Sequence, residues 1–263
     1  MTVGKVIKAG EGLMDLIDSL VKRYQVNPKE AEDIVKNNRW MNLQGAIADE
    51  PTNTTKAYKM FDQRDDGRLY PLFVDADAPI PMNEWMFAKH IKPNDKGAID
   101  SKLGSLSYRP GFHSGTNPFA THIGGKTSRG NPDYRKYNQV WGEIEIPNDY
   151  DWYNEAMMRS RLTNAGDIDL KTAEIKDQLP IGGSYRYNTN PNVAGDWMIS
   201  DRIKVNRLLE RDEIKDINKQ SGVADLPFLD ELIKQGKVDP KKLGPTAIKQ
   251  LKGAGLLDLI KYK

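Results

Sequence analysis

Two of the three histidines of the chain, His113 and His122, stand nine residues apart in a glycine-rich stretch. Glycine lets a ligand approach the backbone closely, and an imidazole can move protons near neutral pH. One interpretation makes the histidines catalytic, with a surrounding set of ligand-binding positions that includes two anion-binding cations: Tyr108, Arg109, Gly111 and Lys126. The other interpretation is structural: Arg109 and the histidines bond buried carbonyl groups where a strand meets a loop, and the glycines only shape turns.

Glu143 and Glu145 are a second candidate site, because they stand two residues apart in the run 139–146. Side chains alternate along a strand, so both carboxylates share one face with Trp141. Such a pair could hold a ribose, act as acid and base, or bind a hard cation. The simpler alternative is the solvated face of a half-buried strand. We expect no metal site, because no third oxygen ligand is evident.

Aromatic and cationic residues also interleave near the end of the central region. Arg186 lies between two tyrosines, and Asp196 and Trp197 follow a short Asn-rich stretch. Such residues could stack on a base and hold a phosphate, which would give nucleotide or nucleic-acid contact. They could equally be core anchors with a polar tip. The run 124–127 looks like the end of a phosphate-binding loop but lacks its first glycine, so we do not predict one.

The elements that position these residues form, by prediction, an α+β protein: a compact, mostly antiparallel sheet domain flanked by N-terminal and C-terminal helices. We expect a helical N-terminal segment at 1–60, the sheet domain at 61–210 and a helical C-terminal tail at 211–263. Short runs rich in aromatic and branched residues predict strands at 69–74, 105–112, 139–146, 183–187 and 197–205. A long loop without periodicity is expected from 114 to 138.

Apolar residues recur at helical spacing in both terminal segments. In the N-terminal segment they are Leu13, Leu16, Ile17, Leu20 and Val21, and in the C-terminal tail Phe228, Leu229, Leu232, Ile233, Leu256, Leu257 and Ile260. We expect Asp225 to cap a helix that ends at Gly236. Because burying one large apolar side chain stabilises a protein by about 1.5–3 kcal/mol, these stripes need cover. We expect them to dock on self or virion subunits, with packing on the sheet as the alternative.

Composition bounds the function class. The 263 residues are 38% hydrophobic and 29% charged with a net charge of +2, which fits a globular protein and excludes the large basic excess of a dedicated nucleic-acid binder. The absence of cysteine excludes disulfides, thiolate metal sites and a cysteine nucleophile. No apolar run predicts a signal peptide or a membrane span.

The ordered series 69–74, 108–113, 121–124, 139–145, 185–192, 197–200 and 203–209 resembles a domain of unknown function. That domain recurs in bacteriophage proteins and in the large polyvalent proteins of phages and conjugative elements. The resemblance covers about residues 66 to 216. It implies a mobile-element protein that travels with the virion or enters the host with DNA, and so a location in the virion or the host cytoplasm.

A more distant similarity is to ADP-ribosyltransferases. It implies that Arg109 and His113 match the first element of that fold and hold NAD, the cofactor of this class. Glu143 and Glu145 look like its acidic pair, although that pair usually lies near the end of the fold, where this chain has Asp196. Either Glu145 or Asp196 would then stabilise an oxocarbenium-like centre.

We therefore expect a bacteriophage-encoded accessory protein, virion-associated or delivered with DNA, that acts mainly by binding. The first alternative is an ADP-ribosyltransferase-like enzyme that uses NAD. The second is a metal-independent ribonuclease with His113 and His122 as its acid–base pair and Arg109 and Lys126 on the phosphate. We expect Arg109, His113 and His122 to converge on one concavity beside the long loop, and both enzyme interpretations depend on this.

Overall fold

A computed structural model describes residues 28–29, 51–89, 94–95, 98–101, 104–107, 111–127, 133–154, 179, 182–187 and 196–261. The predicted N-terminal helices lie outside these residues, except that Pro28 and Lys29 are helical. The sheet domain begins earlier than expected, because the first strand, β1 (Thr54–Gln63), starts at Thr54. The mostly antiparallel sheet of an α+β protein is confirmed.

The main sheet has nine strands in the order β10-β11-β12-β6-β1-β9-β13-β3, with β2 paired to the end of β1. Its members are β2 (Leu69–Tyr70), β3 (Trp85–Phe87), β6 (Phe112–Gly115), β9 (Gln139–Pro147), β10 (Tyr150–Asp151), β11 (Gly183–Tyr187), β12 (Trp197–Ser200) and β13 (Arg202–Leu208). All neighbours are antiparallel except β10 and β11. The central pair is β1 with β9, aligned from Thr54 opposite Pro147 to Asp62 opposite Gln139.

The segment predicted as one strand, 197–205, is two strands separated by Asp201. β12 pairs with β6 while β13 pairs with β9, so these consecutive strands lie at opposite sides of the β6-β1-β9 unit. The sheet must therefore curl until its two sides meet. The bend has a local cause, because the buried Asp201 carboxylate accepts hydrogen bonds from the Gly182 amide and the Arg202 Nε.

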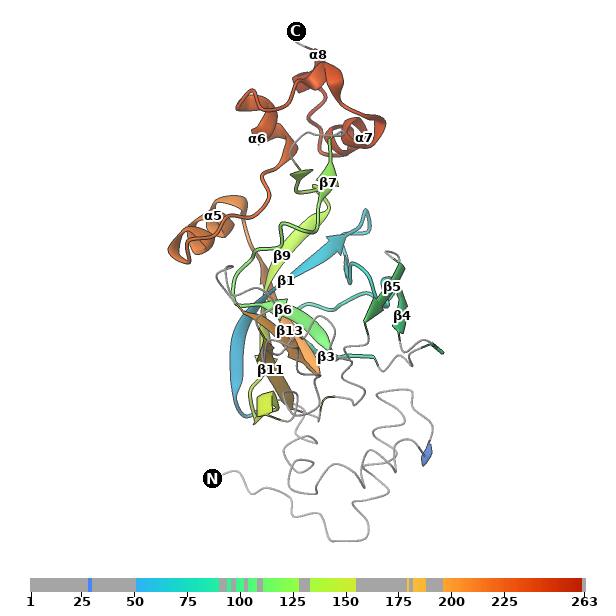
Figure 1. Ribbon diagram of the computed structural model, residues 1–263, viewed down its shortest axis with the longest axis vertical. Helices are drawn as coiled ribbons and strands as arrows, with labels where there is room; N and C mark the ends of the chain where they lie inside the picture. Colours follow the sequence, from blue (N-terminus) through green and yellow to red (C-terminus); the bar gives the residue numbers. More distant parts are fainter. Residues whose placement is uncertain are drawn as a thin grey trace, which may run out of the picture.

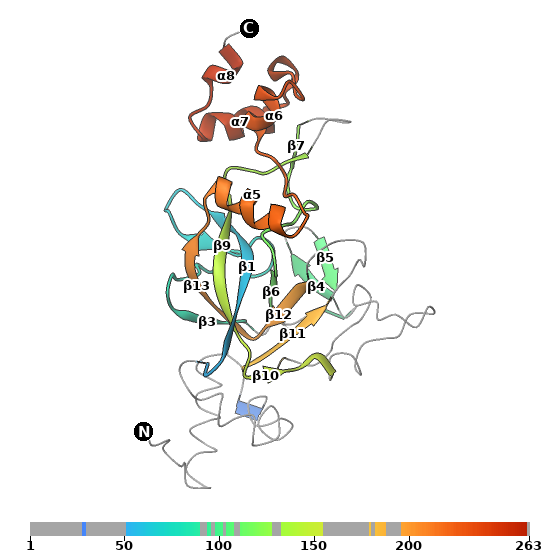
Figure 2. The ribbon, with the colours of Figure 1, turned by 90° about the vertical axis from the view of Figure 1, so that its left-hand side faces the viewer.

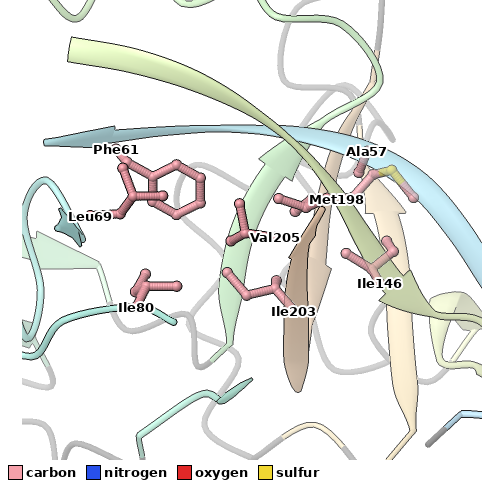
Figure 3. Close-up of a cluster of buried hydrophobic side chains, with 9 residues drawn as sticks. Ala57, Phe61, Leu69, Ile80, Ile146, Met198, Ile203 and Val205 are labelled. Carbon is pink, nitrogen blue, oxygen red and sulfur yellow. The ribbon is translucent and has the colours of Figure 1, made fainter. Parts of the chain in front are cut away.

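Strand alternation places the apolar core on the concave face of this curled sheet. Ala57 and Phe61 of β1 lie opposite Ile144 and Val140 of β9, and the same face of β12 contributes Met198. Figure 3 shows side chains of this core, among them Ala57, Phe61 and Met198, converging from several strands. The buried members of the cluster are Ala57, Phe61, Leu69, Ile80, Ile144, Ile146, Met198, Ile203 and Val205.

The convex face carries a second cluster where helix α5 (Arg211–Gln220) lies beside the ends of β1 and β9 (Figure 2). Tyr58, Met60 and Trp141 pack there against Ile214 and Leu209. Asp212 and Glu213 stand in the first turn of α5 and Lys219 in its last turn, which suits the helix dipole. The convex face is thus apolar under α5 and charged beyond it.

The last helices of the chain gather at one end of the molecule (Figure 1). They are α6 (Leu229–Lys234), the short 3-10 helix η1 (Pro240–Lys242), α7 (Pro245–Gly253) and α8 (Asp258–Lys261). These helices form a core with Tyr134, and Leu229, Leu232 and Leu251 are fully buried in it. Much of the C-terminal stripe therefore finds its cover inside the chain, and docking on another subunit is not needed to bury it.

The prediction that Asp225 is the N-cap of α6 is wrong. Phe228 occupies the N-cap position, and the Glu231 carboxylate accepts the Phe228 amide at 2.9 Å. Gly236 ends the helical segment as predicted, with a positive φ of 68°. Asp225 lies before the helix and is used elsewhere, as described below.

Two strand predictions need correction. Only Leu69 and Tyr70 of the run 69–74 form a strand, since Pro71 lacks an amide donor for a ladder. The run 105–112 contains the end of β5 (Gly104–Ser107), which forms a hairpin with β4 (Ala98–Ser101), and the start of β6. The predicted loop 114–138 contains a small hairpin of β7 (Gly125–Lys126) and β8 (Asp133–Tyr134).

None of the described helices is long and apolar enough to cross a membrane.

Candidate functional site

The two histidines lie around Trp197 on the convex face of the sheet. His113 of β6 is opposite Ile199 of β12, and Gly115 is opposite Trp197, so alternation puts His113 and Trp197 on one face. His122 follows in a turn and meets the Trp197 ring edge-on, with 5.7 Å between ring centroids. Tyr108 and Arg109 lie outside the described residues. The structure thus brings both histidines to the Trp197 face but leaves their predicted partner Arg109 untested.

The electrostatic setting of His122 favours its neutral form. Burial lowers the pKa of the imidazole, the Arg135 charge lowers it further, and Asp225 partly opposes both. A neutral imidazole can accept a proton, so a general base at this position is chemically open.

The glycines of the two histidine motifs serve close packing. A Cβ atom on Gly111 would lie 2.6 Å from Ile199 Cγ2 and 2.9 Å from the Ser200 carbonyl, and its φ of +119° also excludes other residues. A Cβ on Gly125 would lie 2.5 Å from the Tyr134 ring. Lys126 is exposed on the β7–β8 hairpin. These observations support the structural interpretation of the glycines.

Glu143 and Glu145 share the convex face of β9, as alternation predicts, and both are held by cross-strand partners. The Glu143 carboxylate accepts from Arg207 at 3.0 Å and lies 3.8 Å from Lys56. The Glu145 carboxylate accepts from Asn206 at 3.0 Å and pairs with Lys204 at 3.0 Å. This is the pattern of an ordinary amphipathic strand with a charged outer face.

The remaining predicted residues are dispersed. Arg186 is exposed on β11, opposite Met198. The backbone of Asp196 pairs with Thr116, whose amide donates to the Asp196 carbonyl at 2.9 Å. The half-buried Trp197 packs against the cluster under α5 and against a second apolar cluster of Trp152, Leu179, Tyr185 and Ile199. Base stacking on Trp197 would therefore compete with its contacts to the protein.

A buried network that the sequence analysis missed lies beside His122. The Arg135 guanidinium, 1% exposed, donates from Nε and Nη2 to the Asp225 carboxylate. The same carboxylate accepts the Trp141 indole N–H at 2.8 Å and the Ala120 amide at 3.1 Å. Arg135 also donates to the carbonyls of Ala120 and Ile123. We call Arg135, Asp225 and Trp141 the junction network, because they tie the sheet, the 120–123 turn and the segment before α6 together.

The junction network borders a groove of about 660 Å³ between α5 and α6, which we call the α5–α6 groove. Trp141 and Ile214 lie at its sheet side, Val223 and Leu226 belong to the connecting segment, and Phe228 lies at the start of α6. The cations Arg211, Lys215 and Lys219 stand at i, i+4 and i+8 of α5, so they follow one edge of the groove. The only sequence signal for it was this spacing within a helix.

Asn218 is a buried polar side chain that lines the α5–α6 groove. It is 1% exposed, and its Nδ2 donates to the Pro118 carbonyl at 2.8 Å. Its Oδ1 has no hydrogen-bond partner among the described residues. An unsatisfied buried carbonyl is destabilising unless a water or a ligand donates to it.

Three other charged side chains lie away from the groove: Lys59, which is half-buried, and the buried neighbours Asp201 and Arg202. Burial lowers the pKa of the Lys59 ammonium to about 8, and its Nζ donates to the His113 carbonyl at 2.8 Å. Burial raises the pKa of the Asp201 carboxyl to about 6, although Arg202 beside it acts in the opposite direction. Nη1 and Nη2 of Arg202 have no hydrogen-bond partner in the described part of the chain, and its guanidinium stacks on Phe87.

Comparisons of this chain with family models, with curated proteins and with solved structures gave no match.

Proposed function

We propose that this chain is a bacteriophage-encoded accessory protein, virion-associated or delivered with DNA, that acts mainly by binding, and that the α5–α6 groove is its binding site. The phage context rests on the resemblance of residues 66 to 216 given above. The binding role rests on a single structural contrast: Glu143 and Glu145 are held in ion pairs, whereas the groove is an open concavity lined by a residue with an unsatisfied buried acceptor.

The state of Glu143 and Glu145 supports binding over ADP-ribosyl transfer. A catalytic carboxylate must reach the reacting atoms of the substrate. Here Arg207 and Lys56 contact Glu143, while Asn206 and Lys204 contact Glu145. A substrate would have to displace these partners before either acid could stabilise positive charge.

The ribonuclease alternative keeps one supporting observation, the shared location of His113 and His122 around Trp197. An acid–base pair needs one imidazole protonated and the other neutral. The lowered pKa of His122 would suit it for the base. We rank the ribonuclease below the binding function, because its predicted phosphate ligand Lys126 lies on the β7–β8 hairpin, outside the main sheet that carries His113.

The test uses the purified full-length chain in three assays. Labelled NAD with host lysate reports ADP-ribosyl transfer, labelled RNA without added metal reports cleavage, and sedimentation with purified phage particles reports association. We expect particle association without either activity. Label transfer that Glu145→Gln abolishes, or RNA cleavage that His113→Ala abolishes, would overturn the binding proposal.

A further inference from the structure

The charge around the α5–α6 groove is unbalanced in a way that selects a ligand. Four cations line it, Arg135, Arg211, Lys215 and Lys219, against the two acids Asp225 and Glu231. Asp225 is bonded within the junction network, and the Glu231 carboxylate accepts from Lys215 at 2.6 Å. The acids are therefore neutralised by the protein, and the excess positive charge remains for a ligand.

Lys219 is the cation best placed to bind a ligand anion. The Arg211 guanidinium bonds Asp230 and stacks on the Phe228 ring at 3.7 Å, so its position is fixed. Lys215 is paired with Glu231 and Asp212. Lys219 is exposed, and no ion pair holds it among the described residues. A ligand carboxylate could therefore pair with Lys219 without displacing any protein group.

The wall of the groove is apolar, but the aromatic side chains that line it among the described residues, Phe228 and Trp141, offer no free face. Arg211 covers the Phe228 ring, and Tyr137 lies 5.6 Å from it between ring centroids. Trp141 is 3% exposed, and Asp225 already accepts its indole N–H. Binding of a nucleic-acid base normally uses stacking on an open aromatic face. Aliphatic side chains such as those of a peptide fit this wall better than bases do.

The polar groups without partners suit a peptide backbone. Asn218 lines the groove, its buried Oδ1 has no hydrogen-bond partner among the described residues, and a peptide N–H is a matching donor. The main chain of Ala224 and Leu226, in the segment between α5 and α6, makes no hydrogen bond to other described residues. A short extended peptide could pair with both.

From these observations we infer that the α5–α6 groove binds a short acidic peptide segment of a partner protein, with apolar side chains against Val223, Leu226 and Ile214 and a carboxylate at Lys219. The inference rests on the proposed binding function and adds the ligand class. Electrostatic complementarity makes the binding sensitive to salt.

The probe is a random peptide library displayed on phage, selected on the immobilised full-length chain. The variant Lys219→Glu reverses the free charge at the groove, and Val223→Asp places a charge on the apolar wall. Lys249→Glu on α7 is the matched control, because Lys249 is also exposed but does not line the groove. All three substitutions are at positions that are at least partly exposed, and a circular-dichroism melt verifies folding.

We expect the wild type and Lys249→Glu to enrich peptides that combine aspartate or glutamate with aliphatic residues. A fluorescently labelled selected peptide should bind Lys219→Glu and Val223→Asp at least about tenfold more weakly, measured by anisotropy. No enrichment, enrichment of basic peptides, or tighter binding of a single-stranded oligothymidylate to the groove would overturn the inference. Such a result would leave the proposed function standing if particles still bind, whereas NAD or RNA turnover would remove that function regardless of the peptides.

Discussion

The curled sheet and the C-terminal helices bury their apolar side chains in two different ways. The core of the sheet joins residues far apart in the chain, from Ala57 to Val205. The helical core draws mainly on residues 229–259, with Tyr134 and Tyr137 from the β7–β8 side. One region depends on distant strand pairing and the other on local helix formation, and the α5–α6 groove lies where they meet. The comparison suggests two packing units joined by the junction network.

The largest losses of stability should come from truncating one buried side chain in each core. Phe61→Ala in the sheet should lower the free energy of unfolding by about 3–5 kcal/mol, and Leu251→Ala in α7 by about 2–5 kcal/mol, because both side chains are fully buried. If the regions are separate units, Leu251→Ala should melt the helices and leave the sheet folded. Hydrogen exchange on both variants measures this, and a single shared transition in Leu251→Ala would show that the two cores are one.

The junction should be nearly as sensitive. Asp225→Asn leaves the buried Arg135 charge without its counter-ion, which costs about 3–5 kcal/mol when one partner of a buried pair is removed. Denaturant unfolding measures the loss. The double variant Arg135→Met with Asp225→Leu is the control, since removing both charges should cost less than removing one. Equal losses in the two variants would mean that packing, and not charge, holds the junction.

The bend between β12 and β13 should make stability depend on pH. The pKa of Asp201 is raised to about 6 when folded, above the value of about 4 for an unfolded aspartate, so ionisation is disfavoured in the folded state. The contribution of Asp201 to the free energy of unfolding should be largest below about pH 4 and fall by on the order of 1–3 kcal/mol as the pH rises through about 6. Asp201→Asn should flatten that slope in urea unfolding curves. If the slope is unchanged in Asp201→Asn, the pH dependence arises from other carboxyl groups.

The smallest effect is expected on the outer face of β9. Glu143→Gln should change the free energy of unfolding by about 0–1 kcal/mol, because its partner Arg207 is 46% exposed and such pairs are weak. Thermal melts of Glu143→Gln and Glu145→Gln should nearly overlay that of the wild type. A loss of several kcal/mol would show that the charged face, like the junction, supports the fold.

Local patterns explain what the sequence could predict. The alternation of 139–146 placed Glu143 and Glu145 on one face, and the spacing of Leu229, Leu232 and Gly236 predicted α6 and its end. These features depend on neighbours along the chain. The charges that hold Glu143 come instead from two other strands, β1 and β13, which no local pattern reveals.

The missed features all depend on distant contacts. β1 mixes lysines with apolar residues, and its strand character becomes evident only through its pairing with β9. Arg135 and Asp225 are 90 positions apart in the chain. The sequence predicted Asp225 as the N-cap of α6, whereas Phe228 occupies that position. The α5–α6 groove requires both segments in place, so the sequence showed only its row of cations.

The most direct test of the binding account is the map of amide chemical shifts when the selected acidic peptide is added to isotope-labelled full-length chain. The account predicts changes concentrated in α5, in residues 221–228 and at the start of α6, and their loss in Lys219→Glu. Changes centred on His113, His122 and Trp197, retained in Lys219→Glu, would contradict it and move the binding site to the histidine face of the sheet.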